Sequence, residues 1–328
     1  MPYYPEKKPV VPGKETKRTA GPAEKRRKLL RLLLAACFCF LIGYGAVRLI
    51  PYVSDLNASR QSSRELRDIR EQAESASESP AQEPAQTISP SPDPAGTPAQ
   101  DMNTLMPGSE AETGVLQPMV YPDNPGLRMS DRFRQLRKKS KYIVGWICFD
   151  EVDEAVAQKD NTFFLDHDAA GRKNSNGAIF LDSGIFLTER PYTLFLYGHN
   201  MKSGNMFGKL KKYKESSYFY ENRIIAFDSL YEDGQYAVFS VLEISTVPGT
   251  ARWYNLWSLN TASLADREEA IRTLERRSVV SSTLDVQADD QLLLLVTCLD
   301  GDTERLVVAA RRLRNNETAD SLVNRKNP

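Results

Sequence analysis

The segment that decides the fold reads Gln291-Leu-Leu-Leu-Leu-Val-Thr-Cys298-Leu-Asp-Gly-Asp-Thr-Glu-Arg305-Leu-Val-Val-Ala-Ala-Arg-Arg-Leu313. Two apolar runs, 291–297 and 305–313, are separated by the turn formers Asp300 and Gly301. This pattern is typical of two antiparallel strands joined by a turn. It predicts that Arg305, which opens the second strand, lies near Cys298, which follows the first.

Similar short runs rich in β-branched and aromatic residues lie upstream, with turn pairs such as Asn176-Gly177 between them. We expect further strands at 142–149, 178–181, 193–197, 223–227 and 236–247. Amphipathic patterns predict short helices at 130–141 and 206–213, and a longer helix that is capped by Ser263. The fold class is therefore mainly β, a closed barrel or a sandwich decorated by helices.

Composition excludes several kinds of protein. The 328 residues carry 43 basic and 43 acidic side chains, a balance that argues against a protein that coats nucleic acid. Two His nearly exclude a His-rich metal site, and four Cys are too few for a disulfide scaffold. The sequence contains no phosphate-binding Gly loop, no HExxH and no Cys-x-x-Cys pair.

The first fifty residues predict a membrane anchor. Ten Lys or Arg against three Glu precede residue 32, and an apolar run of 16 residues follows at 32–47. We expect a cytoplasmic basic tail (1–28) and a retained transmembrane signal anchor (29–53), with the rest of the chain outside the cell. The alternative is a cleaved signal peptide, but no small-x-small site with a polar start follows the run.

The next segment is predicted to be a linker. Residues 74–127 contain no Lys or Arg, but eight acidic residues and ten Pro. Such a stretch cannot bury enough apolar surface to offset its chain entropy. We therefore expect an extracytoplasmic linker at 54–127, a folded domain at 128–315 and a polar C-terminal tail at 316–328.

Three residues at predicted strand ends could carry chemistry. Taken one at a time, Cys298 could be an ordinary buried Cys, His199 a hydrogen-bonded loop residue, and Arg305 a surface charge. Together they could form a site for nucleophilic acyl transfer: a thiolate attacks, an imidazole moves the proton, and a guanidinium stabilises the oxyanion. His167, between two acids, is expected to be exposed or structural.

At these residues the sequence resembles a class B sortase, a membrane-anchored cysteine transpeptidase of Gram-positive bacteria. The resemblance covers residues 129–313. It is carried most specifically by Leu196-Tyr-Gly-His-Asn-Met201, by Val296-Thr-Cys298 and by Arg305-Leu-Val-Val308. Earlier matches are Asp160-Asn161 and Gly177-Ala-Ile-Phe-Leu-Asp182.

The resemblance implies a closed sortase-type barrel of about eight strands, with an added helix in the loop before the Cys strand. It implies that Cys298 is the nucleophile, His199 the general acid and base, and Arg305 the oxyanion or substrate stabiliser. Thr297, Asn200 and Tyr197 are expected to support the site or to contact substrate, and the loop at 248–290 to form one wall of a peptide groove. No cofactor or metal is expected.

The implied reaction cleaves a C-terminal sorting signal of a surface protein and transfers the acyl group to a peptidoglycan amine. The expected partners are these surface proteins, the cell-wall amine and the lipid bilayer, with no nucleic acid. The same residues would serve a pilus-polymerising sortase or a cysteine peptidase that only hydrolyses. An adhesin or scaffold that kept the barrel but lost activity is the alternative outside enzymes. Cys148 is interpreted as a core or strand residue.

Overall fold

The computed structural model describes residues 22–78, 124–260, 263–299, 303–315 and 317–323, which form two units that divide between Ser54 and Asp55. The elements in chain order are α1 (Pro22–Glu78), α2 (Asp131–Lys139), β1 (Ile143–Phe149), β2 (Val152–Ala157), η1 (Phe163–Leu165), β3 (Ile179–Leu181), η2 (Leu187–Glu189), β4 (Thr193–Tyr197), η3 (Leu210–Lys214), α3 (Ser216–Glu221), β5 (Ile224–Ser229), β6 (Gln235–Ser245), η4 (Leu256–Asn260), α4 (Leu264–Arg277), β7 (Leu292–Cys298), β8 (Glu304–Arg312) and α5 (Ala319–Val323).

The first unit consists of the N-terminal part of α1. An 18-residue window of this helix has a mean hydropathy of 2.1, so it is long and apolar enough to cross a membrane by length and composition. Its large apolar side chains, such as Phe40 and Val47, are exposed. Most of the predicted basic tail falls on residues 1–21, outside the described part of the chain.

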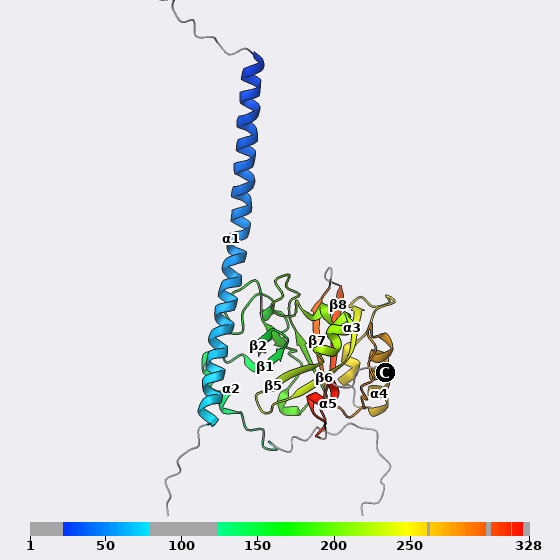
Figure 1. The fold of residues 1–328 in the computed structure, drawn as a ribbon. Helices are drawn as coiled ribbons and strands as arrows, with labels where there is room; N and C mark the ends of the chain where they lie inside the picture. The colour runs from blue at the N-terminus through cyan, green and yellow to red at the C-terminus, as the bar shows by residue number, and fades with distance from the viewer. Residues whose placement is uncertain (1–21, 79–123, 261–262, 300–302, 316, 324–328) are drawn as a thin grey trace, which may run out of the picture. The chain divides into compact units, whose positions relative to one another are not determined.

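The second unit is built on a closed barrel of eight strands in the order β1-β2-β3-β4-β7-β8-β6-β5 (Figure 1). The predicted mainly β fold, a closed eight-stranded barrel with added helices, is confirmed. Seven strands lie within two residues of the predicted runs. The sequence pattern missed β2, whose two adjacent acids, Asp153 and Glu154, interrupt its apolar residues.

The otherwise antiparallel barrel contains two parallel pairs, one of which determines where the candidate site forms. β4 pairs in parallel with β7, and β2 with β3. Parallel neighbours need a long crossover, and the chain between β4 and β7 supplies β5, β6 and α4. Because β4 and β7 run side by side in one direction, both end at the same rim of the barrel.

The apolar run at 291–297 forms β7, which lies in the core of the barrel. Its four leucines, 292–295, are fully buried. β7 lies between β4 and β8, so neither of its edges is free. A strand that is covered on both faces reads as a continuous apolar run, which explains why this segment shows no alternation.

The predicted helix before the Cys strand is α4. The Ser263 hydroxyl accepts a hydrogen bond from the Asp266 N–H (3.3 Å), as the capping pattern predicts. Arg267 is fully buried and ties α4 to the barrel. Its guanidinium donates to the Thr193 hydroxyl and to the carbonyl oxygens of Tyr192, Leu259, Ala288 and Asp290. The helix expected at 206–213 is shifted, since η3 begins only at Leu210.

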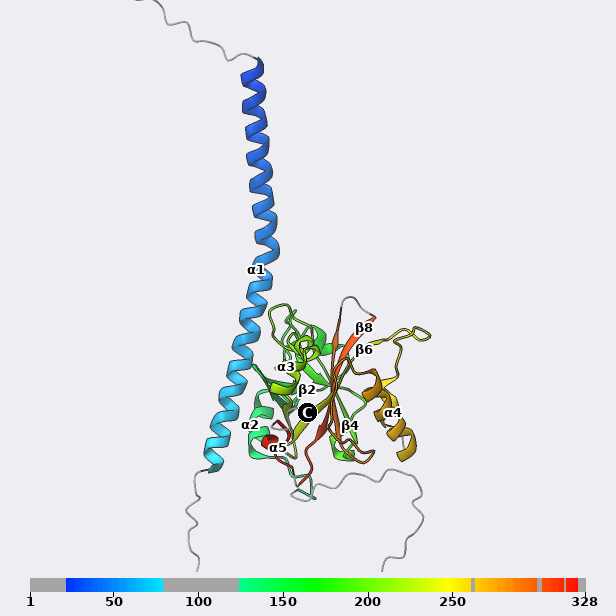
Figure 2. The same cartoon turned by 45° about the vertical axis from the view of Figure 1, so that its right-hand side comes forward.

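The linker expected from residue 54 differs from the structure over its first part. Helix α1 continues to Glu78, and its residues from Asp55 onward lie along α2 and the β1–β2 pair (Figures 1 and 2). Leu66 is 2% exposed, and the Ser63 hydroxyl donates to Glu154 (2.6 Å). The polar composition of 54–127 as a whole does not reveal this helix. Leu66 and Ile69 are three residues apart and therefore lie on the same helical face. Residues 79–123 lie outside the described chain.

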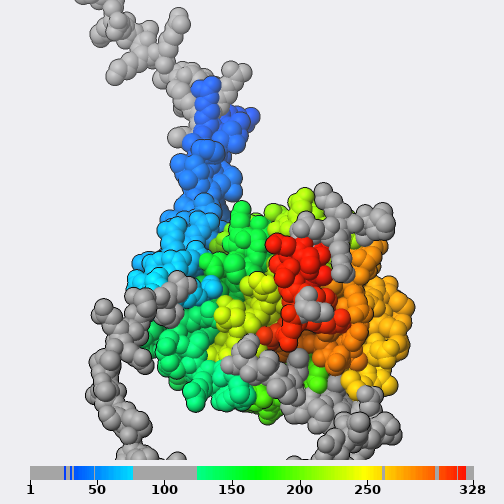
Figure 3. Space-filling model, turned by 60° about the horizontal axis from the view of Figure 1, so that its bottom comes forward, coloured from blue at the N-terminus to red at the C-terminus, as the bar shows by residue number. Residues whose placement is uncertain are grey.

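The expected polar tail at the C-terminus also packs on the barrel. Leu322 in α5 is 1% exposed, and Glu317 forms an ion pair with the buried Arg311. Figure 3 shows this C-terminal segment (red) lying against the strands beside it. A buried leucine and an ion pair to a buried guanidinium thus hold part of a segment whose composition is otherwise polar.

Candidate active site at the rim of the barrel

The β7–β8 pairing brings Cys298 next to Arg305. The two residues are direct partners in the antiparallel register. Side chains that face each other in this way have Cβ atoms about 4.5–5.5 Å apart. The proximity predicted from the hairpin pattern is therefore confirmed, although its turn at 300–302 lies outside the described residues.

The parallel β4–β7 pairing brings His199 to the same rim. Tyr197, the last residue of β4, is in register with Val296, and the Gly198 N–H donates to the Val296 carbonyl (3.3 Å). The Thr297 hydroxyl donates to the Gly198 carbonyl (2.7 Å). A Cβ on Gly198 would lie 2.9 Å from the Phe207 ring, so a larger residue does not fit there. Thr297, the residue before Cys298, thus holds Gly198, the residue before His199.

The imidazole of His199 is oriented by a contact with a backbone carbonyl. Its Nε2 atom lies 2.6 Å from the carbonyl oxygen of Leu165, at the end of η1. A carbonyl oxygen only accepts hydrogen bonds, so Nε2 carries the proton of this bond. Nδ1 is then the ring nitrogen that remains for proton transfer.

These side chains line one cavity of about 220 Å³. Cys298, His199 and Arg305 are each half-buried. The lining residues are Asn161, Leu165, Phe180, Tyr197, Gly198, His199, Val296, Thr297, Cys298 and Arg305. A thiol, an imidazole and a guanidinium, three groups that nucleophilic acyl transfer uses, therefore share a single concave surface.

Behind one wall of the cavity lies a buried carboxylate, Asp182, which is 2% exposed. It accepts hydrogen bonds from the Tyr197 hydroxyl (2.8 Å) and from the Asn161 amide (3.1 Å). The pKa of Tyr197 is raised, first by burial and then by the negative charge of Asp182, while Arg305 acts in the opposite direction.

Comparisons with known proteins agree with this geometry. A family model described as the sortase domain matches residues 151–313. Sortase B of Listeria monocytogenes is 30% identical over 183 residues, 53% of this chain and 69% of the relative. Sortase B of Staphylococcus aureus is 30% identical over 189 residues, 56% of this chain and 75% of the relative.

The chain belongs to the sortase family. A solved Bacillus anthracis structure described as similar to sortase B has a TM-score of 0.51 at 29% identity, and the match covers 57% of this chain and 85% of that one. The resemblance to class B sortases is therefore confirmed. Sortases are cysteine transpeptidases, and this chain is an enzyme of that family.

Of the residues expected to support the site of this sortase, two line the cavity and one does not. Tyr197 and Thr297 lie in its wall. Asn200 pairs with Met206 in an isolated bridge and is not among the lining residues. No described residue of 248–290 lines the cavity, so the expected wall from that loop is not found around it.

The structure adds lining residues to which the sequence assigned no role: Asn161, Leu165, Phe180 and Val296. Asn161 and Asp182 lie in segments that carry the family resemblance, but nothing in the sequence indicated that they meet. They are 21 residues apart and meet because Asn161 follows β2, Asp182 follows β3, and these two strands pair in parallel. Leu165 acts through its backbone carbonyl, a group that residue type does not reveal.

Two other residues behave as structural groups. His167 stacks on the Phe163 ring (centroids 3.9 Å apart) and pairs with Asp166, which agrees with the structural role expected for it. Cys148 lies on β1, so of the two expected roles, core or strand residue, it has the second, and its exposed side chain excludes the first. The alternation of β1 turns this one position outward.

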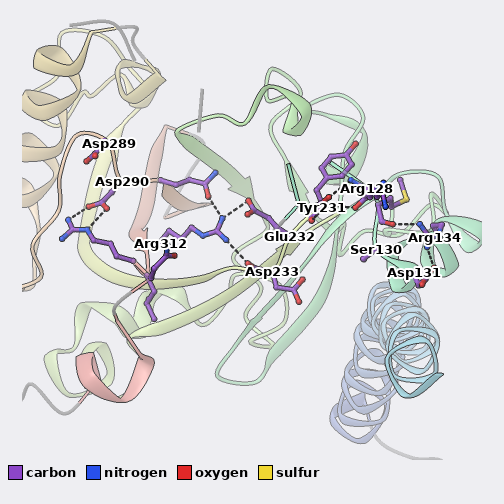
Figure 4. Close-up of a pocket in the computed structure, with 16 residues that line it drawn as sticks. Arg128, Ser130, Asp131, Arg134, Tyr231, Glu232, Asp233, Asp289, Asp290 and Arg312 are labelled. Carbon is purple, nitrogen blue, oxygen red and sulfur yellow. Dashed lines mark hydrogen bonds and ion pairs between the residues drawn. The ribbon is translucent and has the colours of Figure 1, made fainter. Parts of the chain in front are cut away.

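A larger hollow of about 720 Å³ lies at the other end of β7 and β8, where Gln291 and Arg312 line it (Figure 4). Several of its charged groups are paired with each other: Arg312 contacts Glu232 (2.8 Å), and Arg314 contacts Asp290 (2.7 Å). Since Cys298, His199 and Arg305 line the smaller cavity at the opposite rim, that cavity is the candidate active site.

Proposed function

We propose that this sortase cleaves a C-terminal sorting signal and transfers the acyl group to a cell-wall amine. The Cys298 thiolate attacks the carbonyl carbon of a Thr-Gly-like or Thr-Asn-like bond. The carbon–nitrogen bond breaks, the departing amine takes a proton from His199, and an acyl-thioester remains on Cys298. A second amine then attacks the thioester, gives its proton to His199 and restores the thiolate.

The observation that carries this proposal is the shared cavity of Cys298, His199 and Arg305. The hydrogen bond from Nε2 to the Leu165 carbonyl supports Nδ1 as the nitrogen that exchanges the proton in this proposal. The guanidinium of Arg305, directly across from Cys298 in the β7–β8 register, is suited to stabilise the negative oxygen that forms on the attacked carbonyl.

The proposed acceptor is an amine of peptidoglycan, from a cross-bridge or a stem peptide. One solved sortase B structure is a complex with triglycine, and another, from Staphylococcus aureus, is a complex with substrate. We propose that the apolar part of α1 anchors the enzyme in the cell membrane, with the basic N-terminus in the cytoplasm and the catalytic domain outside. Membrane attachment would raise the effective concentration of both substrates.

The reaction can be tested with the full-length protein in detergent micelles and a quenched-fluorescence peptide library that contains Thr-Gly and Thr-Asn bonds. Triglycine serves as the amine. We expect faster peptide cleavage with triglycine and a ligated product by mass spectrometry. Cleavage that is indifferent to the amine would instead support a peptidase, and ligation only to a Lys side chain would support pilus polymerisation.

Three substitutions test the roles of the residues. Cys298→Ala should abolish turnover, His199→Ala should nearly abolish it, and Arg305→Lys should impair it severely, because a point charge cannot reproduce a forked donor. Cys148→Ala and His167→Gln are the matched controls, and both should keep wild-type turnover. Equal losses in the control variants would contradict the assignment.

A further inference from the structure

The buried carboxylate of Asp182 receives three hydrogen bonds. Besides the Tyr197 hydroxyl and the Asn161 amide, the Gly184 N–H donates to it (2.8 Å). A carboxylate that is removed from water is costly unless donors surround it. An uncharged amide has only one acceptor oxygen, so an Asn at this position could not receive all three donors.

Two of these donors belong to residues of the cavity wall. Tyr197 and Asn161 both line the cavity that contains Cys298 and Arg305, whereas Asp182 does not. Both donate to the same carboxylate oxygen, Oδ2. One buried atom thus links two separate parts of the wall, the end of β4 and the loop before η1.

This arrangement determines what the Tyr197 hydroxyl can offer. A hydroxyl that donates its proton to a carboxylate keeps only acceptor capacity for any other partner. The guanidinium of Arg305 lines the same cavity, and its positive charge opposes the rise in the pKa of Tyr197. Tyr197 therefore presents an acceptor oxygen to a cavity that also contains a guanidinium.

Asn161 is held at both ends of its amide. Its Nδ2 donates to Asp182, and its Oδ1 accepts from the Ser183 N–H (2.8 Å). Because both contacts define the same orientation, the amide cannot flip without losing them. The backbone around Asp182 is itself held by Gln158, which donates to the Asp182 carbonyl (2.8 Å).

We propose that Asp182 is a positioning residue for the acyl transfer: it acts through Tyr197 and Asn161, and holds the Tyr197 oxygen as an acceptor beside the guanidinium of Arg305. The proposal rests on the proposed function, because it assigns Asp182 to the same cavity. Asp182 touches no reacting atom. It sets the polarity and the position of groups that face the substrate.

A double-mutant cycle tests whether Asp182 acts through Tyr197. Asp182→Asn and Tyr197→Phe should each lower kcat/KM by roughly ten- to a hundredfold, the loss expected for one hydrogen bond to a charged group. The double variant should be no slower than the slower single variant. Asp289→Asn, an exposed acid beyond the far end of β7, is the matched control and should keep wild-type kcat/KM. Losses that multiply in the double variant, or an Asp182→Asn variant that keeps the wild-type kcat/KM, would overturn the proposal.

A second measurement does not depend on turnover. With 3-fluorotyrosine placed at position 197 of the full-length protein, 19F NMR follows the ionisation of this one phenol. Asp182→Asn should lower the phenol pKa because it removes the neighbouring negative charge, whereas Asp289→Asn should leave it unchanged. A phenol pKa that does not respond to Asp182→Asn would overturn the proposal.

The two readouts also separate this proposal from the proposed function. If the wild-type protein cleaves no library peptide but the phenol responds to Asp182→Asn, the sorting-signal reaction fails while the coupling between Asp182 and Tyr197 stands. If the peptide is cleaved but neither Asp182→Asn effect occurs, the reaction stands and the positioning role fails. Thermal unfolding of Asp182→Asn, followed by circular dichroism, verifies that the variant is folded.

Discussion

The hydrogen bond from Thr297 to Gly198 joins the strand that ends in Cys298 to the strand that leads to His199, and Thr297→Val removes it. Valine has nearly the shape of threonine but no donor, so the Gly198 carbonyl loses the hydroxyl that lies 2.7 Å away. Thr297 is 2% exposed, so water cannot easily replace the hydroxyl. An acceptor left without its partner in this way costs about 1–3 kcal/mol of stability.

For a domain of this size, each kcal/mol lowers the melting temperature by about 2–4 °C. We expect thermal unfolding of the Thr297→Val variant, followed by circular dichroism, to shift downward by a few degrees to about 10 °C. Turnover with the peptide library and triglycine should fall by about tenfold or more, because a small displacement of His199 misplaces its Nδ1.

Thr297→Ser is the matched control, since it keeps the hydroxyl and loses only a methyl group. It should retain most of the turnover. If Thr297→Val melts within about 1 °C of the wild type and turns over as fast as Thr297→Ser, the two strands are not held together by this bond, and the reasoning is refuted.

Three further predictions concern the elements around the barrel. Leu66→Ala should destabilise the catalytic unit by about 2–5 kcal/mol, because Leu66 is buried between α1 and the barrel; an unchanged melting temperature would contradict this packing. Removal from water raises the pKa of Glu154 to about 7 in the folded state, whereas its ordinary value in the unfolded state is 4.5. Between these pH values the folded state holds a proton that the unfolded state has released, so stability should fall as the pH rises. Glu154→Gln should flatten that part of a stability profile measured from pH 4 to 8. Arg267→Met should lower the free energy of unfolding, measured with urea, by about 3–5 kcal/mol, because several buried carbonyl oxygens lose a charged donor. Arg272→Met, on the exposed face of α4, is the control and should lower it by less than about 0.5 kcal/mol. Equal losses would refute the role of Arg267 in holding α4 on the barrel.

Local pattern predicted those parts of the fold in which each residue interacts with near neighbours in sequence. The β7–β8 hairpin is such a case, because a turn between two apolar runs places Cys298 opposite Arg305. The α4 cap is another, because Ser263 and Asp266 lie within one helical turn. β2 was missed because its adjacent acids point to partners on other elements, which no local pattern shows.

The sequence by itself determined the apolar strands, the charge asymmetry of the N-terminal third and the three reactive residue types, since these depend only on residue identity and spacing. The tertiary structure alone decided that β4 runs parallel to β7, and therefore that His199, 99 residues before Cys298, lies at the same rim. It also placed a backbone carbonyl against the Nε2 atom of His199, and the Tyr197 and Asn161 donors against Asp182. The contacts that Leu165 makes with His199, and that Tyr197 and Asn161 make with Asp182, join residues 15 to 34 positions apart, so no local pattern in the sequence shows them.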